Sequence, residues 1–516
     1  MPFAYLRKQR LEQERLQQRH GAQHQPHDGS RRAIKVGLLA MLVAPLLFQL
    51  PWVHSAFGPG TRLPALWVRS AAPSSTGANG AECWNVRGGD EFRFCEDIEA
   101  IPGTAEVLIS CDANRAHWNT AMGPLADAGP RGGLFSYAYP TSRGGERAEA
   151  QPVPLVDFPA QSTFHPLGMS ILPRSDGGEG GVLFVVNHRR ERSSVELFHL
   201  SPRDRGGWEA HWQRSIVHHL ATHTPNSIHA LTPTSFIVTN DHLFARRPGP
   251  RDTHLVPLLQ HVLFGGAVAG GWREWIVVRV AMLLSRRGVA ARLAQVETLL
   301  ALPLGWASYV EFDATQQEDA GVSASRIATA IPFANGIALT HTTMFVAATT
   351  YPGLFIYALP PSPTPLAWQL RPTTKVHLPM RVDNLAWSHS AHSSHRTLLA
   401  TGHPAPLALM RMARAPRTRT SASWSVAVSA HAHGTSARAW EDAEAPLPAH
   451  HFTLSHSADW DIRTLLQSTG EEVVVSGETV SISSSASSFL YADGEQGTLI
   501  VSGLYGPVLT CTGVSA

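Results

Sequence analysis

Charged residues are scarce in this chain of 516 residues, at 16% where about 25% is usual. Neither sign prevails, because 42 Lys and Arg face 40 Asp and Glu and leave a net charge of +2. The chain therefore lacks the strong positive field that would attract nucleic acid, and we expect no nucleic-acid partner. Glycine (42) and proline (37) are more frequent than usual, so many turns are expected and long helical bundles are not. The 43% share of hydrophobic residues excludes general disorder.

Several common catalytic signatures are also missing. The sequence contains neither the Gly-x-Ser-x-Gly motif of serine hydrolases nor the His-Glu-x-x-His motif of zinc proteases. It has no Walker A motif and no Gly-x-Gly-x-x-Gly fingerprint. Any chemistry must therefore come from residues that the fold brings together.

The N-terminal region differs from the rest of the chain. Residues 1–35 carry eight Lys or Arg and three acidic residues, and the uncharged segment 36–53 that follows is just long enough to span a bilayer as a helix. The positive-inside rule then predicts a cytosolic basic tail (1–35), a transmembrane anchor (36–53), a Ser/Gly/Pro-rich stalk (54–80) and a lumenal or extracellular domain (81–516). This is a single-pass type II arrangement. A cleaved signal peptide and a secreted protein are the alternative.

A pattern recurs beyond Glu96: polar residues, one apolar residue, a short connection and an apolar, strand-like run. Copies begin at Glu96, His165, Asn226, Asn335 and Asp383, and the segments 498–505 and 507–511 fit a sixth unit. The five copies start 69, 61, 109 and 48 residues apart. Strand-turn-strand units that recur every few tens of residues predict an all-β, six-bladed propeller. The long gap after the third copy indicates a helical insertion at 245–310.

Equivalent positions of a propeller repeat converge on one central channel. Those positions hold Glu96, Asn226, Asn335, Asp383 and Asn384, all with oxygen donors. Calcium takes six to eight such ligands, whereas zinc prefers His or Cys. The alternative is that Asn335-Gly336 and Asp383-Asn384 only form turns.

At these residues the chain resembles the serum paraoxonase/arylesterase family. The resemblance runs from about Cys83 to Cys511 and is carried by CEDIEAIPG, FHPLGMS, FVVNHRRERSSVELF, TNDHLF, FANGI, VDNLAW and GHP. Each stretch is short, but together and in this order they are specific. The family is a six-bladed propeller with two channel calcium ions, and it hydrolyses lactones, aryl esters and some phosphotriesters.

The resemblance implies roles for individual residues. The motifs place Glu96, Asn226, Asn335, Asp383 and Asn384 as ligands of the catalytic calcium. Asp97 matches a ligand of the second, structural calcium, and Met169 stands where the family uses a backbone carbonyl for that ion. His188 matches one histidine of the family's proposed dyad, while Asp241, His242 and His403 match further channel-lining positions.

Two positions depart from the family. The other dyad histidine, proposed to activate water, is Leu167 here, and His165 lies two residues earlier on the same side of an extended chain. Either His165 substitutes for the missing histidine or the chemistry differs. Ser227 replaces a second Asp, which makes the structural calcium less certain than the catalytic one.

The resemblance also pairs two of the four cysteines. Cys83 and Cys511 match the family's disulfide between the first and last strands of the propeller. Cys95 and Cys111 have no counterpart in the family, and they either pair across a hairpin or stay free.

Two further segments carry expectations. Within the insertion, residues 271–287 place Trp272, Ile276, Val280 and Leu283 near one helical face with basic residues at the ends. Such a helix either lies on a membrane surface or packs over the propeller. The Ala/Ser/His-rich stretch 412–450 is expected to be a partly disordered surface loop.

These features predict a calcium-dependent hydrolase of small lactones or aryl esters. Calcium would polarise the carbonyl, and His188 is the best candidate to deprotonate water. One alternative is a non-catalytic calcium-binding propeller, a binding or adhesion module that has lost a dyad histidine. The other is a sugar-lactonase.

Overall fold

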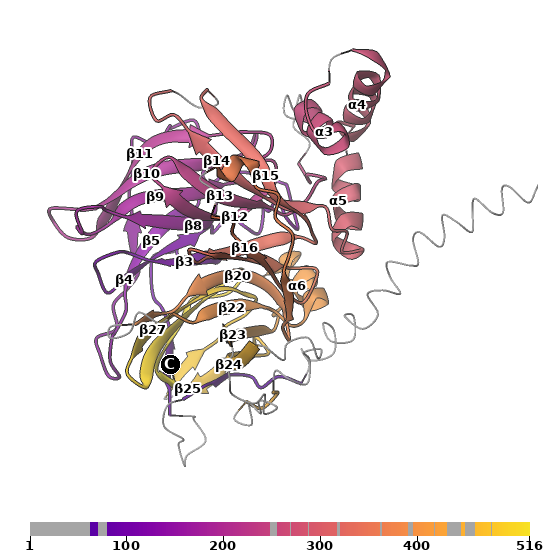
Figure 1. The fold of residues 1–516 in the computed structure, drawn as a ribbon. Helices are drawn as coiled ribbons and strands as arrows, with labels where there is room; N and C mark the ends of the chain where they lie inside the picture. Colours follow the sequence, from indigo (N-terminus) through magenta and orange to yellow (C-terminus); the bar gives the residue numbers. More distant parts are fainter. Residues whose placement is uncertain are drawn as a thin grey trace, which may run out of the picture. The chain divides into compact units, whose positions relative to one another are not determined.

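The computed structural model describes residues 62–70, 80–247, 255–268, 270–286, 288–316, 320–361, 364–390, 396–416, 418–430, 445–448, 460–475 and 477–515. These residues fall in one compact unit, Trp52–Ala516. Within it, six sheets of four or five strands are arranged as the blades of a propeller (Figure 1). The predicted fold class is therefore confirmed for the part of the chain that the structure describes.

The first three blades are built from strands that follow one another in the chain. Blade 1 contains β3 (Cys95–Ala100), β4 (Glu106–Cys111), β5 (Gly133–Ala138) and β6 (Gln151–Val153). Blade 2 contains β8 (Pro166–Pro173), β9 (Gly181–Asn187), β10 (Ser194–Pro202), β11 (Trp208–Ile216) and, at its edge, β7 (Leu155–Val156). Blade 3 contains β12 (Pro225–Thr232), β13 (Ser235–Asn240), β14 (Gly305–Phe312) and β15 (Val322–Ile331).

The last three blades follow the same plan with additional edge strands. Blade 4 contains β16 (Ala334–Leu339), β17 (Thr343–Ala348), β18 (Gly353–Ala358) and β19 (Thr374–His377). Blade 5 contains β20 (Arg381–Trp387), β22 (Leu398–His403), β23 (Ser423–Ala430), β24 (Trp460–Ser468) and β1 (Trp67–Val68). Blade 6 contains β21 (His389–Ser390), β27 (Ser485–Asp493), β28 (Gln496–Gly503), β29 (Leu509–Ser515) and β2 (Glu82–Asn85). A small separate sheet pairs β25 (Val473–Val475) with β26 (Glu478–Val480).

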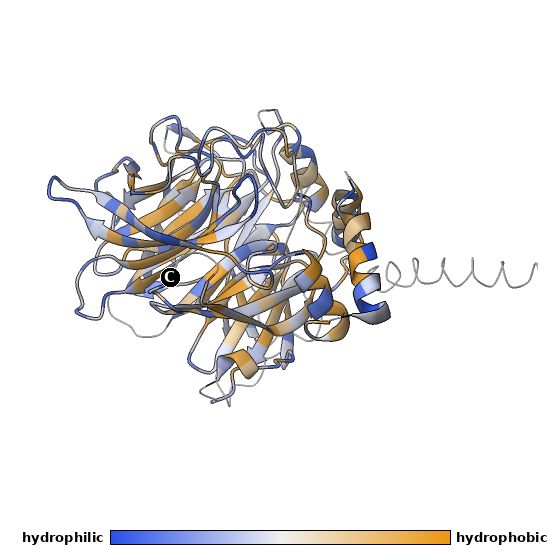
Figure 2. Ribbon diagram, turned by 90° about the horizontal axis from the view of Figure 1, so that it is seen from above, coloured by the Kyte–Doolittle hydropathy of each residue, from blue (hydrophilic) through white to orange (hydrophobic). Residues whose placement is uncertain are grey.

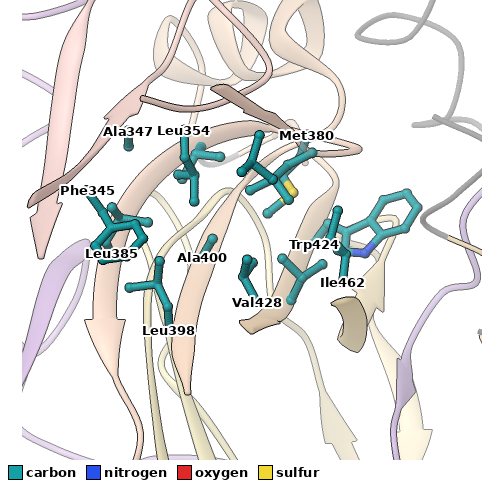
Figure 3. Close-up of a cluster of buried hydrophobic side chains, with 14 of the residues drawn as sticks. Phe345, Ala347, Leu354, Met380, Leu385, Leu398, Ala400, Trp424, Val428 and Ile462 are labelled. Atoms are coloured by element: carbon teal, nitrogen blue, oxygen red, sulfur yellow. The ribbon is translucent and has the colours of Figure 1, made fainter. Parts of the chain in front are cut away.

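The innermost strands β3, β8, β12, β16, β20 and β27 contact one another in a closed ring. Six clusters of buried hydrophobic side chains fill the spaces between neighbouring blades, including the space between blades 6 and 1. Figure 3 shows the cluster between blades 4 and 5, where Phe345 and Leu354 of one sheet face Leu385 and Trp424 of the next. Hydrophobic residues concentrate in the strands and hydrophilic residues in the connecting loops (Figure 2). Each blade is thus stabilised chiefly by burying both faces against its neighbours.

The ring is closed by strands from both ends of the domain. β2 pairs with β29 in antiparallel register, and Cys83 lies opposite Cys511. The two cysteines form the disulfide that the family resemblance implied. Cys95 and Cys111 are also bonded, across the β3–β4 hairpin, which settles the alternative left open by the sequence.

Helices α3 (Leu255–Phe264), α4 (Gly271–Leu284) and α5 (Val289–Leu299) lie together beside the sheets (Figure 1). These three helices form the insertion. It ends earlier than expected, because residues 305–310 already belong to β14. The remaining helices are η1 (Pro365–Ala367) and α6 (Pro406–Ala413).

Three other expectations need correction. The stretch 412–450 is not simply a loop, because Ser423–Ala430 is a buried strand of blade 5. Part of the predicted stalk is folded, since β1 pairs with β24 and Val68 is buried. The face of α4 that packs inward contains Val277, Ala281 and Leu284 rather than Trp272 and Leu283, which are exposed.

The predicted anchor lies outside the described residues. Among the residues that are described, no helix combines the length and the hydropathy needed to cross a bilayer. The basic tail, the anchor at 36–53 and the single-pass arrangement therefore remain predictions.

Candidate active site

All six innermost strands interrupt their regular pairing at one level of the ring. The register shifts lie between Cys95 and Asp97, Pro166 and Met169, Pro225 and Ile228, Ala334 and Ile337, Val382 and Leu385, and Ser485 and Ser488. Such bulges redirect side chains and are common beside active sites. The predicted calcium ligands of four different strands, namely Glu96, Asn226, Asn335, Asp383 and Asn384, all fall within these irregularities.

The glycines at this level allow neighbouring strands to approach. A Cβ on Gly336 would lie 2.5 Å from the backbone nitrogen of Leu385, and one on Gly168 would lie 2.6 Å from the carbonyl oxygen of Asn226. Asn335 and Gly336 therefore lie inside strand β16, at its contact with β20. The alternative that Asn-Gly and Asp-Asn serve only as turns is wrong, because both pairs belong to innermost strands.

The predicted ligands meet in one pocket and leave oxygen atoms without partners. Glu96, Asn226, Asn335 and Asp383 line this pocket, and Asn384 contacts Glu96. Buried oxygens with no hydrogen-bond partner are Glu96 Oε2, Asn226 Oδ1, Asn335 Oδ1 and Asn384 Oδ1. Burying an oxygen acceptor without a partner is costly unless a cation or water satisfies it. These four hard donors fit the coordination preference of calcium.

The two carboxylates of this set are held in place by neighbouring side chains. Asp383 accepts hydrogen bonds from the Asn335 amide and from His403 Nε2, the latter at 3.0 Å. Glu96 Oε1 accepts one from the Asn384 amide at 2.8 Å. Burial raises the pKa of Glu96 well above its usual value, and the nearby Asp97 and Asp383 raise it further. In the absence of a cation, burial and the neighbouring carboxylates therefore disfavour the ionised form of Glu96, and Arg115 offsets this only in part.

Asp97 and Ser227, which the family resemblance places at a second ion, fit a cation less well than the first set of ligands does. Asp97 Oδ1 accepts the backbone N–H of Ile98, and Oδ2 accepts that of Met169 at 2.8 Å. Burial raises the pKa of Asp97 to about 6. Both oxygens of Asp97 are thus already engaged, and Ser227 contributes no charge. The second calcium stays a prediction with less structural support than the first.

His188 lies at the end of β9 and faces the same pocket. Its Nε2 lies 2.7 Å from the Pro225 carbonyl oxygen, and its Nδ1 contacts the Thr120 hydroxyl. Burial lowers the pKa of His188 to about 4, so the imidazole is neutral near pH 7. A neutral imidazole of defined tautomer can accept a proton at Nδ1.

His165 also lines the pocket, but its surroundings differ from those of His188. Its Nδ1 lies 3.0 Å from Asp112 Oδ2, and its Nε2 lies 2.7 Å from the Ala128 carbonyl oxygen. Both nitrogens therefore face acceptors, which is not the arrangement of a free general base. Leu167 lies in the pocket wall, where it offers no polar atom.

The remainder of the pocket wall is largely apolar. Its side chains come from the loop after β4, from the turn before β16, from α6 and from the segment after β28; they include Trp118, Met122, Phe333, Leu409 and Leu504. Arg115 and Thr349 add polar atoms. An apolar cavity with a few converging polar groups is the usual form of a small-molecule site.

The arylesterase family model matches residues 142–248. This part of the chain is therefore similar to the arylesterases. No curated protein matches the chain. The arylesterase match covers His165, Leu167, His188 and Asn226. Glu96, Asn335, Asp383, Asn384 and His403 lie outside the match, and the fold places them around the same channel.

Sequence reasoning missed the contribution of the loop between β4 and β5. This loop supplies Asp112, Arg115, Trp118 and Thr120 to the pocket, although it holds no metal-binding or nucleophile motif. The only indication in the sequence was the position of this loop, which directly follows the strand pair β3–β4 with the Glu96 motif.

His242 lies outside this pocket and attaches helix α5 to the propeller. Its Nδ1 lies 2.9 Å from Asp241 Oδ1, and its Nε2 lies 2.7 Å from the Thr298 hydroxyl of α5. The neighbouring Glu297 accepts the backbone N–H groups of Leu243 and Phe244. Burial raises the pKa of Glu297 to about 7. Burial alone would lower the pKa of His242, but Asp241 and Glu297 reverse the effect and raise it.

We expect the attachment of α5 to weaken as pH rises from about 5 to 8. The His242 imidazole and the Glu297 carboxyl group both bind their protons more tightly in the folded chain than in the unfolded chain. The free energy that they contribute to folding is therefore lost as pH rises through their folded pKa values. Hydrogen exchange of the 289–299 amides, corrected for intrinsic rates, should show less protection at pH 8 than at pH 6. Glu297→Gln should reduce the difference. Equal protection at both pH values, once corrected, would contradict the expectation.

Proposed function

We propose that this chain, part of which is similar to the arylesterases, is a calcium-dependent hydrolase of lactones and aryl esters. The observation that carries the proposal is the set of four unpartnered oxygens, from Glu96, Asn226, Asn335 and Asn384, beside a neutral His188. The fit to calcium is supported by the oxygen-only donor set. The described part of the chain contains no group of three or more His, Cys, Asp or Glu that could hold a metal ion, and the donor set proposed here combines carboxylate with amide oxygens.

A bound calcium ion would supply a Lewis acid for the ester carbonyl and positive charge for the developing oxyanion. The protein's own residues prepare this site. Asn335 and His403 orient Asp383, while Asn384 orients Glu96. Because these side chains are already fixed, they need no reorganisation when the substrate arrives.

His188 supplies the basic nitrogen. Its Nε2–H is directed at the Pro225 carbonyl oxygen, which leaves the Nδ1 lone pair facing the pocket side. The apolar wall formed by Trp118, Leu167 and Phe333 favours a substrate with a hydrocarbon acyl or aryl group, and it limits the water around the carbonyl.

The test is hydrolysis by the purified full chain of phenyl acetate, a lipophilic δ-lactone and a sugar lactone, with calcium and with EDTA. We expect turnover of the first two substrates with calcium, none after chelation, and a lower melting temperature in EDTA. Full activity after exhaustive chelation would exclude the metal-dependent mechanism. Preference for the sugar lactone would favour a sugar-lactonase, and calcium binding without turnover would favour a binding module.

His188→Ala should lower kcat on the order of 10²-fold, the typical loss for a general base. Leu167→His restores the family's residue in the pocket wall, and we expect it to raise lactonase activity or shift the pH profile, because a second imidazole could share the proton. Steady-state kinetics from pH 5 to 9 measure both effects. A His188→Ala enzyme as active as the parent would remove His188 from the mechanism.

Two disulfides support a lumenal or extracellular location for the propeller, because such bonds persist in oxidising compartments. We therefore propose that the segment 36–53 anchors the chain or directs its secretion. The exposed Trp272 and Trp275 of α4 are compatible with an additional contact to a membrane surface. Protease protection of membrane-bound chain distinguishes an anchored protein from a secreted one.

A further inference from the structure

The hydroxyl group of Thr120 contacts His188, and both residues line the pocket. Thr120 belongs to the loop between β4 and β5, lines the same pocket as Glu96 and Asn226, and is half-buried. Its Oγ1 forms a hydrogen bond with His188 Nδ1. The family has the second histidine of its dyad at the position of Leu167. With leucine there, Thr120 is the polar group that contacts His188 Nδ1.

The direction of this hydrogen bond follows from the other side of the ring. The Pro225 carbonyl oxygen, 2.7 Å from Nε2, can only accept, so Nε2 carries a hydrogen. The neutral ring then has a bare Nδ1, which can only accept. The Thr120 hydroxyl must therefore donate to Nδ1, and the lone pairs of Oγ1 are left for a partner in the pocket.

The loop holds Thr120 in this position. The indole of Trp118 donates to the His188 carbonyl oxygen at 2.9 Å. The amide of Asn119 donates to the Tyr505 hydroxyl at 2.6 Å, and its carbonyl oxygen accepts the N–H groups of Ala121 and Met122. The two residues that precede Thr120 are thus fixed to other elements, as expected of a group that must be positioned for chemistry.

We propose that Thr120 relays a proton from the attacking water to His188, an inference that rests on the hydrolase function proposed above. Since Nδ1 is occupied by the Thr120 hydroxyl, a water molecule reaches the base through that hydroxyl. The relay replaces the contact that a second histidine at position 167 would otherwise make.

The proton transfers balance. As the water oxygen forms a bond to the carbonyl carbon, one water O–H bond breaks and its proton moves to Thr120 Oγ1. The original Thr120 proton moves at the same time to His188 Nδ1, and the carbonyl π electrons move to the carbonyl oxygen. When the tetrahedral intermediate collapses, the C–O bond to the leaving group breaks and the proton returns from His188, through Thr120, to the leaving alkoxide or phenoxide.

Three variants of the full chain test the relay. Thr120→Val keeps the shape and removes the hydroxyl, Thr120→Ser keeps the hydroxyl, and Thr104→Val is a matched control in a turn that does not line the pocket. We expect Thr120→Val to lower kcat about 100-fold with KM within about twofold of the parent, because general-base assistance is lost while binding is not. Thr120→Ser and Thr104→Val should stay within about fivefold of the parent kcat. The calcium-induced rise in melting temperature should be unchanged in all three.

The outcomes separate this inference from the proposed function. If the parent turns over esters and Thr120→Val equals it, the relay is wrong and the hydrolase function stands. If the parent turns over no ester or lactone while binding calcium, both fail. An acyl group found on Thr120 by mass spectrometry after acid quench would replace the relay by a nucleophilic threonine. Should Thr120→Val not fold, Thr120→Ala also removes the hydroxyl, and kcat equal to the parent's would overturn the relay.

Discussion

Asp383→Asn should abolish hydrolysis and raise the stability of the metal-free protein. The change removes one of the two carboxylates of the candidate calcium site and preserves its shape. We expect kcat/KM to fall by at least about 10³-fold, the scale of losing a major electrostatic contribution to the transition state. The new amide can donate to His403, whose other ring nitrogen has no partner.

The stability change has the opposite sign because Asp383 raises the pKa of Glu96 by charge repulsion. In EDTA the variant should therefore melt at a higher temperature than the parent, and added calcium should raise its melting temperature little. Differential scanning calorimetry with and without calcium measures both. Asn335→Ala should also lose activity, but it retains both carboxylates and should not gain stability in EDTA.

Asp176→Asn serves as the control, because Asp176 is an exposed carboxylate paired with Arg174. It should change neither the activity nor the response to calcium. A parent and an Asp383→Asn variant with the same calcium-dependent shift in melting temperature would show that Asp383 is not part of a cation site.

Removing the Cys83–Cys511 disulfide should destabilise the domain far more than removing Cys95–Cys111. The chain-entropy model relates the stabilisation to the length of chain enclosed. The two bonds have sequence separations of 428 and 16 residues. The model then gives about 6 kcal/mol for the first and about 3 kcal/mol for the second.

Paired Cys→Ser variants, each lacking one disulfide, make the comparison. Urea unfolding with a common slope would give the two losses in free energy, and the calcium response shows whether the site survives. A larger loss from the Cys95–Cys111 pair would mean that local packing around the β3–β4 hairpin, not ring closure, determines the contribution of these bonds.

The sequence predicted the innermost strands of five blades because a polar residue followed by an apolar run marks each of them. It did not reveal the sixth, β27, whose segment SASSFLYAD reads as polar. In the structure these serines are buried by hydroxyl contacts, including Thr401 to Ser488 at 2.7 Å. Hydrophobicity alone cannot identify a strand that is buried through side-chain hydrogen bonds.

The candidate site was predictable to a similar degree. The oxygen donors recur at one position of the repeat, so their convergence followed from the propeller architecture. The contacts of Thr120, Asp112 and Trp118 depend on how an irregular loop folds back over the channel, and no periodicity encodes that path. The contact of His242 with Thr298 was not predictable for the same reason, since Thr298 belongs to the insertion.

Blade 6 combines β2, from the beginning of the domain, with β27, β28 and β29 from its end. During translation, β2 leaves the ribosome hundreds of residues before the strand that it pairs with. The ring cannot close before these late strands have emerged, and the oxygens that β3 and β20 contribute to the candidate calcium site cannot be brought together until β27 between them is present. We therefore expect the domain to acquire its fold only after β27, β28 and β29 have emerged, with the early blades exposed to chaperones in the meantime.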